Sequence, residues 1–448
     1  MLAKVKRSFF CTECGHEALK WLGQCPGCKQ WGSLTEQIKT PQSLRSHHRQ
    51  PMVATYGSIQ PGAHLRFSSG NPEMDRVLGG GFVKGSLLLI GGDPGIGKST
   101  LLLQIAAGLQ AKSMQVLYLS GEESLAQIKL RGERLGIEAD ELSLMAETSF
   151  EVLDQILQDR HVDVLIIDSI QTLYTSTVPS GPGSVTQVRE VTTKILELAK
   201  TRDMTTVLIG HITKEGQIAG PKTLEHMVDG VFYFEGDAYH QLRILRAQKN
   251  RFGPAQELGI FQMTASGLVD VSNPSQLLLD QRPDTCAGSV VVPCIEGTRP
   301  LLVEIQVLLS TSTYAAPRRV AMGIDANRLA LIMAVLEKKA GVQLAGLDIF
   351  VNVVGGLSIG EPALDLALAL AIYSSFRGLA FHPHLAIFGE LGLAGEVRAV
   401  SQPERRLKEC LNMGFTRIIC PKNIPVESHK GLNILPVAHL VDALEAAL

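Results

Sequence analysis

Short apolar runs alternate with amphipathic stretches from about residue 61 to residue 272. The runs cover residues 86–92, 116–123, 162–169 and 205–212. They are short and rich in aliphatic residues, which is typical of buried parallel strands. Helical periodicity lies between them, for example over residues 186–203. This alternation predicts an α/β domain with a mostly parallel sheet over residues 61–272.

The pattern changes after the last of these runs. Residues 230–236 and 241–248 are joined by a short polar turn, which predicts a hairpin added at the edge of the sheet. Residues 273–284 form a plausible boundary. Beyond it strands and helices mix again, so we expect a separate α/β domain over residues 280–448.

A small cysteine module precedes the α/β domain. Residues 1–34 carry the pattern C-x2-C-x10-C-x2-C, followed by a polar, aperiodic linker over residues 35–60. Two such pairs supply four thiolates for a closed tetrahedral zinc site. A redox pair or a disulfide is the alternative, but redox CxxC motifs usually come singly, and structural disulfides are rare in the cytosol. The predicted Zn²⁺ ligands are Cys11, Cys14, Cys25 and Cys28.

Composition limits the choice of partners and compartment. The chain has 448 residues, 45% hydrophobic content and a formal net charge of −2, so two or three full cores are possible. Any nucleic-acid contact must therefore come from local basic patches. The N-terminus does not read as a signal peptide, and no apolar run reaches the roughly 18 residues that span a bilayer. We expect a cytoplasmic protein without a membrane partner.

A phosphate-binding loop follows the first apolar run. The motif G-x4-G-K-[ST] lies between a predicted strand and a predicted helix, the context that it requires. Lys98 should reach the β and γ phosphates of ATP, and Ser99 should ligate Mg²⁺. A chance glycine-rich turn is the alternative. The predicted nucleotide-binding residues are Gly92, Asp93, Pro94, Gly95, Ile96, Gly97, Lys98, Ser99 and Thr100.

Polar residues end three of the other runs. Asp168 ends a buried strand and is predicted to hold Mg²⁺, with a helix N-cap as the alternative. Glu122 and Glu123 follow another run, and at least one could polarise the attacking water. A solvated first-turn acid is the alternative. His211 could sense the γ-phosphate, although a structural histidine fits equally well.

Positive charge is concentrated in residues 243–253, RILRAQKNRFG, and in a nearby loop. The cations of the strand are Arg243, Arg246, Lys249 and Arg251. Residues 171–187 are rich in Gly, Pro, Ser and Thr, and residues 212–227 carry Lys214 and Lys222. Flexible and basic loops suit a single strand of DNA held by its phosphates, with plain surface loops as the alternative.

The residues HLRFSSGNPEMDRVLGGGFVKGSLLLIGGDPGIGKST, SGEES and KNRFG, behind a four-cysteine module, resemble the bacterial RadA (Sms) family of DNA-repair proteins. These are RecA-like ATPases, and the resemblance covers essentially the whole chain. It implies that ATP hydrolysis drives branch migration of recombination intermediates. The implied DNA partners are single-stranded and branched DNA. It also implies a homo-hexameric ring with the single strand in its pore and partnership with the RecA recombinase.

The resemblance gives the basic strand a role. It places Lys249 and Arg251 of KNRFG where a neighbouring subunit supplies cations to the transferred phosphoryl group. A patch for the DNA backbone is the alternative. Arg243 and Arg246 could serve DNA, as could Lys214 and Lys222 in a loop that should face the pore.

The C-terminal part resembles the proteolytic domain of Lon over residues 348–372 and 388–410. Ala363 stands where Lon has its nucleophilic serine, and Glu404 where Lon has its lysine. A Ser–Lys dyad needs a hydroxyl and an amine base, so we expect an inactive scaffold. Arg318 and Arg319 could bind duplex DNA or a neighbouring subunit. An ATP-dependent Lon-type protease and a non-motor, ATP-gated scaffold are the rival functions.

Overall fold

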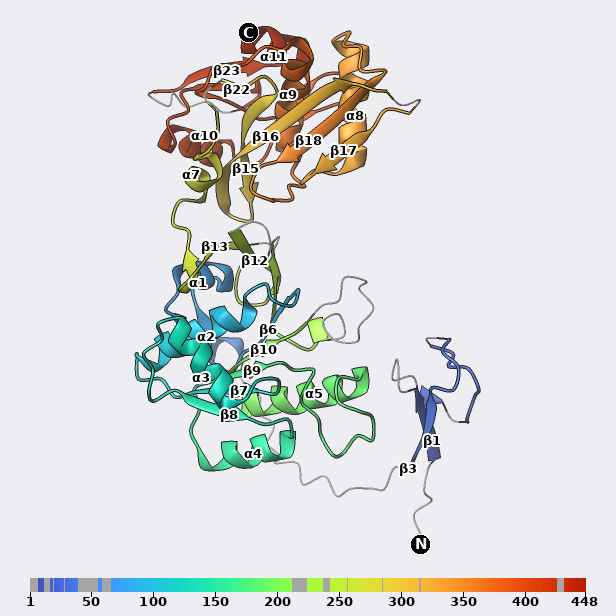
Figure 1. Cartoon of the computed structure of the whole chain (residues 1–448), viewed down its shortest axis with the longest axis vertical. Helices are drawn as coiled ribbons and strands as arrows, with labels where there is room; N and C mark the ends of the chain where they lie inside the picture. The colour runs from blue at the N-terminus through green and yellow to red at the C-terminus, as the bar shows by residue number, and fades with distance from the viewer. Residues whose placement is uncertain are drawn as a thin grey trace. The chain divides into compact units, whose positions relative to one another are not determined.

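The computed structural model consists of two compact units, Met1–Asp270 and Val271–Leu448, which are described separately (Figure 1). The structure describes residues 7–11, 17–18, 20–27, 29–38, 55–58, 66–211, 224–236, 242–255, 257–283, 285–313, 316–424 and 431–448.

The cysteine module forms a small antiparallel sheet with the strand order β2-β1-β3. Its strands are β1 (Arg7–Cys11), β2 (Glu17–Ala18) and β3 (Leu34–Ile38). Its buried side chains include Cys11, Cys25 and Leu34. A core this small contributes little stability by itself, so a bound metal would supply much of it.

A nine-stranded sheet forms the centre of the first unit, in the order β14-β13-β12-β11-β6-β10-β9-β7-β8. Its strands are β6 (Leu87–Gly92), β7 (Val116–Ser120), β8 (Ser143–Ala146), β9 (Val164–Asp168), β10 (Thr205–Ile209), β11 (Gly230–Glu235), β12 (Leu242–Asn250), β13 (Leu258–Thr264) and β14 (Gly267–Asp270). The six strands from β11 to β8 pair in parallel. The predicted α/β fold with a mostly parallel sheet is therefore confirmed.

The predicted hairpin is present as β11 and β12, which pair antiparallel. Its predicted place at the edge of the sheet is wrong, because β13 and β14 extend the sheet beyond it. The short strands β4 (Arg66–Phe67) and β5 (Phe82–Val83) pair antiparallel and form a separate two-stranded sheet.

Helices of the first unit belong to two buried cores. They are α1 (Pro72–Leu78), α2 (Lys98–Gln110), α3 (Leu125–Arg134), α4 (Phe150–Asp159) and α5 (Val185–Arg202), with a short 3-10 turn at Tyr56–Ser58. Side chains of α1, α2 and α3 join one core, and those of α4 and α5 join the other. Because alternate residues of each strand point to opposite faces, the strands are apolar on both faces.

The second unit is a seven-stranded sheet in the order β17-β18-β16-β15-β19-β22-β23. The strands are β15 (Ser289–Glu296), β16 (Arg299–Thr311), β17 (Arg319–Met322), β18 (Leu347–Val353), β19 (Leu385–Ile387), β22 (Arg417–Pro421) and β23 (Asn433–Val437), with the separate pair β20 (Glu390–Leu391) and β21 (Val397–Arg398).

Its helices are α7 (Pro274–Leu279), α8 (Ala326–Lys339), α9 (Asp365–Arg377), α10 (Pro403–Asn412) and α11 (Leu440–Ala447), and a 3-10 turn covers Pro362–Leu364. Residues 274–279, within the stretch read as a boundary, form α7. Residues 366–372 of α9 are all apolar, and the helix is buried over most of its length. No helix in the described ranges is long and apolar enough to cross a membrane.

Candidate functional site

The phosphate loop connects β6 to α2 and depends on its glycines. Gly92 has φ 149° and Gly97 has φ 120°, which L-residues rarely adopt. A Cβ on Gly92 would lie 2.9 Å from Phe234 Cβ, and one on Gly97 would lie 2.9 Å from Met263 Cε. Side chains at these positions would therefore push the loop away from β11 and β13.

Lys98 is the first residue of α2, and its side chain is folded onto the loop. Its ammonium donates to the carbonyl oxygens of Gly92 at 2.8 Å and Asp93 at 2.9 Å. Burial lowers the pKa of Lys98 to about 8, and the nearby charge of Asp168 acts in the opposite direction. The loop thus holds a desolvated cation that phosphate oxygens would stabilise.

Asp168 lies at the carboxyl end of β9 and is 5% exposed. Its Oδ2 accepts a hydrogen bond of 2.7 Å from the hydroxyl of Tyr118, a fully buried residue of β7. Burial and the adjacent Asp168 raise the pKa of Tyr118, so its hydroxyl keeps its proton. The other carboxylate oxygen of Asp168, Oδ1, is an oxygen ligand of the kind that Mg²⁺ prefers. The hydroxyl of Ser99, the second residue of α2, is another.

The two neighbouring glutamates have different surroundings. Glu122 Oε1 accepts from Ser169 Oγ at 2.6 Å and lies 3.2 Å from His211 Nε2. Glu123 instead forms an ion pair of 2.9 Å with Arg131 of α3. The structure thus brings Glu122 and His211 together and engages Glu123 elsewhere.

The first half of the basic strand supports the sheet. Arg243 is 7% exposed, and its Nε donates to the carbonyl of Ile96 in the phosphate loop at 3.1 Å. Arg246 pairs with Glu235 at 2.9 Å. This burial does not favour the DNA contact that we predicted for Arg243, because its guanidinium is directed into the loop rather than outward.

The second half of the strand lies far from the chain's own phosphate loop. Lys249 pairs with Val231, which is level with Leu89 of β6, whereas the loop begins after Gly92. Arg251 follows the next pair, Asn250 with Gly230. Arg251 is therefore level with Leu87, five residues before Gly92. At about 3.3 Å per residue, this places the backbone of Arg251 roughly 17 Å from the loop.

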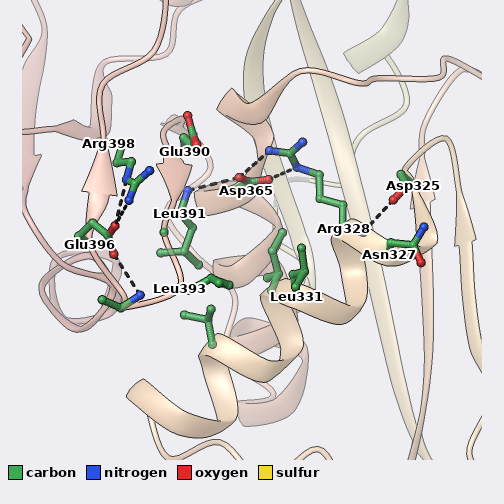
Figure 2. Close-up of a pocket in the computed structure, with 14 residues that line it drawn as sticks. Asp325, Asn327, Arg328, Leu331, Asp365, Glu390, Leu391, Leu393, Glu396 and Arg398 are labelled. Atoms are coloured by element: carbon green, nitrogen blue, oxygen red, sulfur yellow. Dashed lines mark hydrogen bonds and ion pairs between the residues drawn. The ribbon is translucent and has the colours of Figure 1, made fainter.

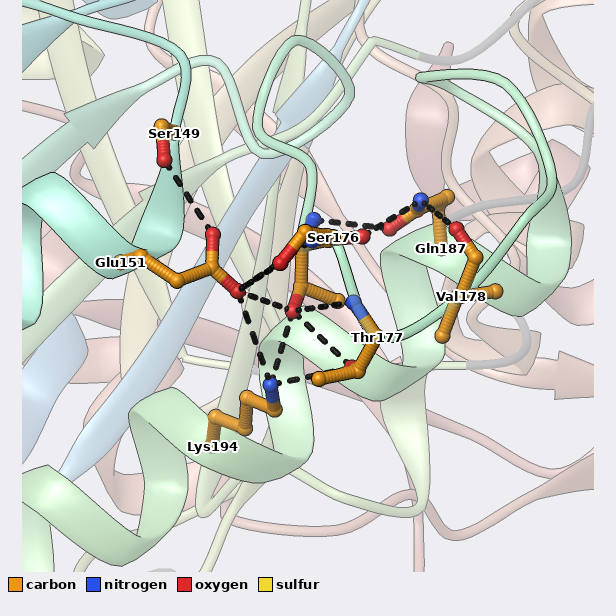
Figure 3. Close-up of polar contacts among 8 residues, drawn as sticks. Ser149, Glu151, Ser176, Thr177, Val178, Gln187 and Lys194 are labelled. Atoms are coloured by element: carbon orange, nitrogen blue, oxygen red, sulfur yellow. Dashed lines mark hydrogen bonds and ion pairs between the residues drawn. The ribbon is translucent and has the colours of Figure 1, made fainter. Parts of the chain in front are cut away.

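The loop after Asp168 is anchored at its base, as Figure 3 shows. The buried amide of Gln187 donates to the carbonyls of Thr175, Val178 and Ser180. Thr175 Oγ1 donates to Glu151 at 2.6 Å and accepts from Lys194 at 2.8 Å. The second predicted DNA loop, with Lys214 and Lys222, lies outside the described residues.

The cysteine module has features that fit zinc. Cys25 Sγ accepts a hydrogen bond of 3.3 Å from the backbone of Gly27, as a thiolate on a tight turn would. Cys11 and Cys25 are 1% exposed and belong to one cluster. Cys14 and Cys28 lie outside the described residues.

The structure also describes Ala363 and Glu404, the two residues that the resemblance to Lon places at the positions of its dyad. Ala363 is fully buried, and Glu404 is exposed on the first turn of α10. Close by, the fully buried Arg406 forms an ion pair with Glu361 and donates to Pro293 O at 2.6 Å. Arg318 and Arg319 are both exposed at the start of the edge strand β17.

A groove of about 690 Å³ also lies in this unit, between α8 and the β20–β21 turn (Figure 2). Arg328 reaches across it to Asp365 with a hydrogen bond of 2.8 Å, and this bond raises the pKa of Arg328. Leu331 and Leu393 line the groove and are 54% and 68% exposed. Neither Ala363 nor Glu404 lines it.

Three family models match separate parts of the chain. Residues 9–36 match a rubredoxin metal binding domain, residues 63–217 an AAA domain, and residues 324–424 the subunit ChlI of Mg-chelatase. Over the full length, the chain is 48% identical to the DNA repair protein RadA of Bacillus subtilis, with 100% of both chains covered. The chain belongs to the RadA family of DNA repair proteins.

Other RadA proteins match equally broadly. The one from Halalkalibacterium halodurans is 48% identical, with 100% of both chains covered. The one from Synechocystis is 46% identical over 100% of this chain and 95% of that protein. A solved KaiC-like protein from Pyrococcus horikoshii aligns with a TM-score of 0.39 and 19% identity, over 46% of this chain and 98% of that one. The predicted family and three-part fold are confirmed.

Several residues of the site were not found from the sequence. Tyr118 has the sequence signature of a core strand residue, yet its hydroxyl donates a hydrogen bond to Asp168. Arg131 has that of a surface helix residue, yet it forms an ion pair with Glu123. Gln187 stands where the predicted loop 171–187 overlaps the predicted helix 186–203, and its role was not foreseen, although three hydrogen bonds from its amide fix the loop. The one signal in the sequence was Tyr118 itself. It is a tyrosine in an otherwise aliphatic strand, and the neighbouring strand ends in the carboxylate of Asp168.

Proposed function

We propose that this RadA-family chain is a DNA-dependent ATPase motor of homologous recombination and DNA repair. It drives branch migration on single-stranded and branched DNA, as a homo-hexameric ring working with RecA. The family membership, the phosphate loop and the acidic residues at the ends of neighbouring strands support ATP hydrolysis.

The position of Lys249 and Arg251 carries the ring assignment. Both lie at the end of the sheet opposite the chain's own phosphate loop, so they cannot reach nucleotide bound there. Arg251 is nevertheless 56% exposed at its side chain and is held by a buried carboxylate, Asp229. An anchored cation with an exposed end suits a neighbour's γ-phosphate, where it would stabilise transition-state charge.

Within one subunit, each residue has a definite task in this proposal. Lys98 turns from the loop carbonyls to the β and γ phosphates, and Ser99 and Asp168 hold Mg²⁺, which neutralises phosphate charge when bound. Glu122 accepts a hydrogen bond from the attacking water and takes its proton. His211, 3.2 Å from Glu122, transmits the state of the γ-phosphate to the loop that follows it.

We further propose that the C-terminal unit is an inactive scaffold. Ala363 offers no nucleophile, and Glu404 puts an exposed carboxylate where a Ser–Lys dyad needs a base amine. Arg318 and Arg319 offer contacts to duplex DNA or a neighbouring subunit. Digestion of casein by the native protein would instead support the Lon-type protease.

Mixing two inactive variants tests the ring mechanism. Lys98→Ala subunits and Lys249→Ala subunits should each lose hydrolysis alone. Mixed rings should regain part of it, because some interfaces combine an intact phosphate loop with an intact Lys249. No recovery in rings that electron microscopy shows to be mixed would refute the assignment.

A second measurement separates a motor from an ATP-gated scaffold. ATP turnover should rise when single-stranded DNA is added, and the protein should displace a strand from a branched substrate. If DNA does not change the rate of ATP turnover and no strand is displaced, the protein would instead be a non-motor, ATP-gated scaffold.

A further inference from the structure

The only two tryptophans of the chain both lie on the surface of the cysteine module. Trp21 is 59% exposed and Trp31 is 75% exposed. Tryptophan is highly buried on average, and its ring is among the largest apolar surfaces that a side chain offers. Neither ring belongs to the buried cluster of the module, which contains Cys11, Cys25 and Leu34. The two exposed rings therefore do not serve the core of the module.

A short antiparallel ribbon holds the two rings beside each other. Gln24 and Trp31 form a β-bridge, and the amide of Gly32 donates to the carbonyl of Gly23 at 2.8 Å. A Cβ on Gly23 would lie 3.3 Å from Trp31 Cζ3 and 3.9 Å from Trp21 Cη2. Both rings thus approach one point next to Gly23, where a larger residue would crowd Trp31.

The turn that carries Cys25 fixes this ribbon. The amide of Cys25 donates to the carbonyl of Gln30 at 2.9 Å, and the amide of Lys29 donates to the carbonyl of Cys25 at 2.8 Å. The side chain of Gln24 donates to the carbonyl of Lys29 at 2.8 Å. The backbone that presents the rings is therefore ordered before any partner arrives, which reduces the entropy lost on binding.

The charges next to the rings are positive. Lys20 precedes Trp21, Lys29 lies two residues before Trp31, and both lysines are exposed. Residues 18–35 contain neither aspartate nor glutamate, although the whole chain has 44 acidic and 42 basic residues. The rings thus stand in a basic segment without acids, which suits a polyanion.

Exposed aromatic rings beside lysines are the composition of a surface for single-stranded nucleic acid. An unpaired base offers a face that stacks on an aromatic ring whatever the sequence, and lysines bind the phosphates between the bases. In a duplex these faces are covered by the neighbouring base pairs. Tryptophan is also frequent in protein interfaces, but such interfaces are depleted in lysine. The surroundings of the rings therefore favour single-stranded DNA over a protein.

We propose that Trp21 and Trp31 form a stacking platform for unpaired bases of single-stranded DNA, with Lys20 and Lys29 contacting the adjacent phosphates. The inference rests on the proposed function, in which single-stranded DNA is a partner, and it adds the cysteine module as a DNA contact outside the ATPase domain. The platform selects unpaired bases without reading their sequence.

Intrinsic tryptophan fluorescence tests the platform in the native protein, because both tryptophans belong to it. A single-stranded oligothymidylate should quench the emission saturably as its bases stack on the rings. A strand of the same length made of abasic sites keeps the phosphates but has no bases, so it should quench far less. Equal quenching by the abasic strand would show that charge alone acts, which would overturn the stacking.

Variants test each ring by the fluorescence anisotropy of a labelled oligothymidylate at fixed salt. Trp21→Ala and Trp31→Ala should each weaken binding about tenfold. Trp31→Phe keeps a ring and should recover most of that loss. Leu22→Ala is the matched control, because it removes a 42% exposed apolar side chain without a ring from the same segment. It should bind within about twofold of the native protein, since such a contact contributes little.

Metal analysis should find the same zinc content in every variant, so that weaker binding is not a loss of the folded module. With zinc retained, native-like binding by both alanine variants would refute the platform. A loss in Leu22→Ala as large as that in Trp31→Ala would also refute it, because a general apolar contact would then explain both.

The failure of the platform differs from the failure of the proposed function. If the native protein binds no single-stranded DNA, the proposed function fails and the inference fails with it. If the strand binds and raises ATP turnover, but neither quenches tryptophan emission nor responds to Trp21→Ala and Trp31→Ala, only the platform is refuted. The exposed rings would then belong to a protein interface.

Discussion

At the scale of single residues, Lys98 gives the site a dependence on pH. Burial lowers the pKa of Lys98 to about 8, and bound phosphates would favour its charged form. Above pH 8 the empty site must therefore take up a proton to bind ATP. We expect ATP affinity to be constant between pH 7 and 8 and to fall up to about tenfold per pH unit above that.

Titration calorimetry in buffers of different ionisation enthalpy would measure both the affinity and the proton uptake. Lys98→Met should bind more weakly and lose the pH dependence. An affinity of the native protein that stays constant up to pH 9.5 would argue against a depressed pKa.

The pair Glu122 and Glu123 provides a second test at this scale. Glu122→Gln removes the base next to His211 and should reduce kcat by a factor of about 10²–10⁴, with nucleotide binding retained. Glu123→Gln weakens the pair with Arg131 and should cost less than about tenfold. Single-turnover kinetics would check this. The reverse order would assign water activation to Glu123.

At the scale of elements, the loop after Asp168 depends on one amide. In Gln187→Glu a carboxylate would face the carbonyls of Thr175, Val178 and Ser180, to which Nε2 now donates. Buried acceptors without a donor cost about 1–3 kcal/mol each. We expect residues 175–184 to become sensitive to protease and single-stranded DNA to bind more weakly.

Gln158→Glu is the control for that prediction, since it makes the same change of charge on the exposed face of α4. It should leave both properties unchanged. Equal protease resistance of the Gln187→Glu loop would show that other contacts, such as those of Glu151 and Lys194, hold it.

The sequence predicts elements well where the pattern is local. The parallel strands and α5 follow from apolar runs and periodicity, and the phosphate loop follows from glycines that the structure requires. The four residues of β8 were missed because they pair with β7, which lies on the far side of α3 in the sequence. The pair β13–β14 was missed although it is a local hairpin that turns between Thr264 and Gly267. The hydrogen bond from Arg243, a predicted DNA contact, to Ile96 O was not foreseen, since only the fold brings these two distant residues together.

At the scale of the whole molecule, the two compact units should respond to different perturbations. The proposed nucleotide contacts belong to the first unit, whereas the fully buried Arg406 is paired with Glu361 in the second. Glu361→Gln keeps the side-chain shape but leaves the charge of Arg406 without its counterion. Removing one partner of a buried pair costs about 3–5 kcal/mol.

Differential scanning calorimetry should therefore resolve two transitions. Mg²⁺ and ADP should raise the midpoint of one transition, because a ligand stabilises only the folded unit that binds it. Glu361→Gln should lower the midpoint of the other by several degrees and leave the effect of nucleotide unchanged. Glu404→Gln, an exposed change in the same unit, is the control and should shift neither. If one transition moved with both nucleotide and Glu361→Gln, the units would unfold cooperatively, and the C-terminal unit would contribute to the stability of the ATP site.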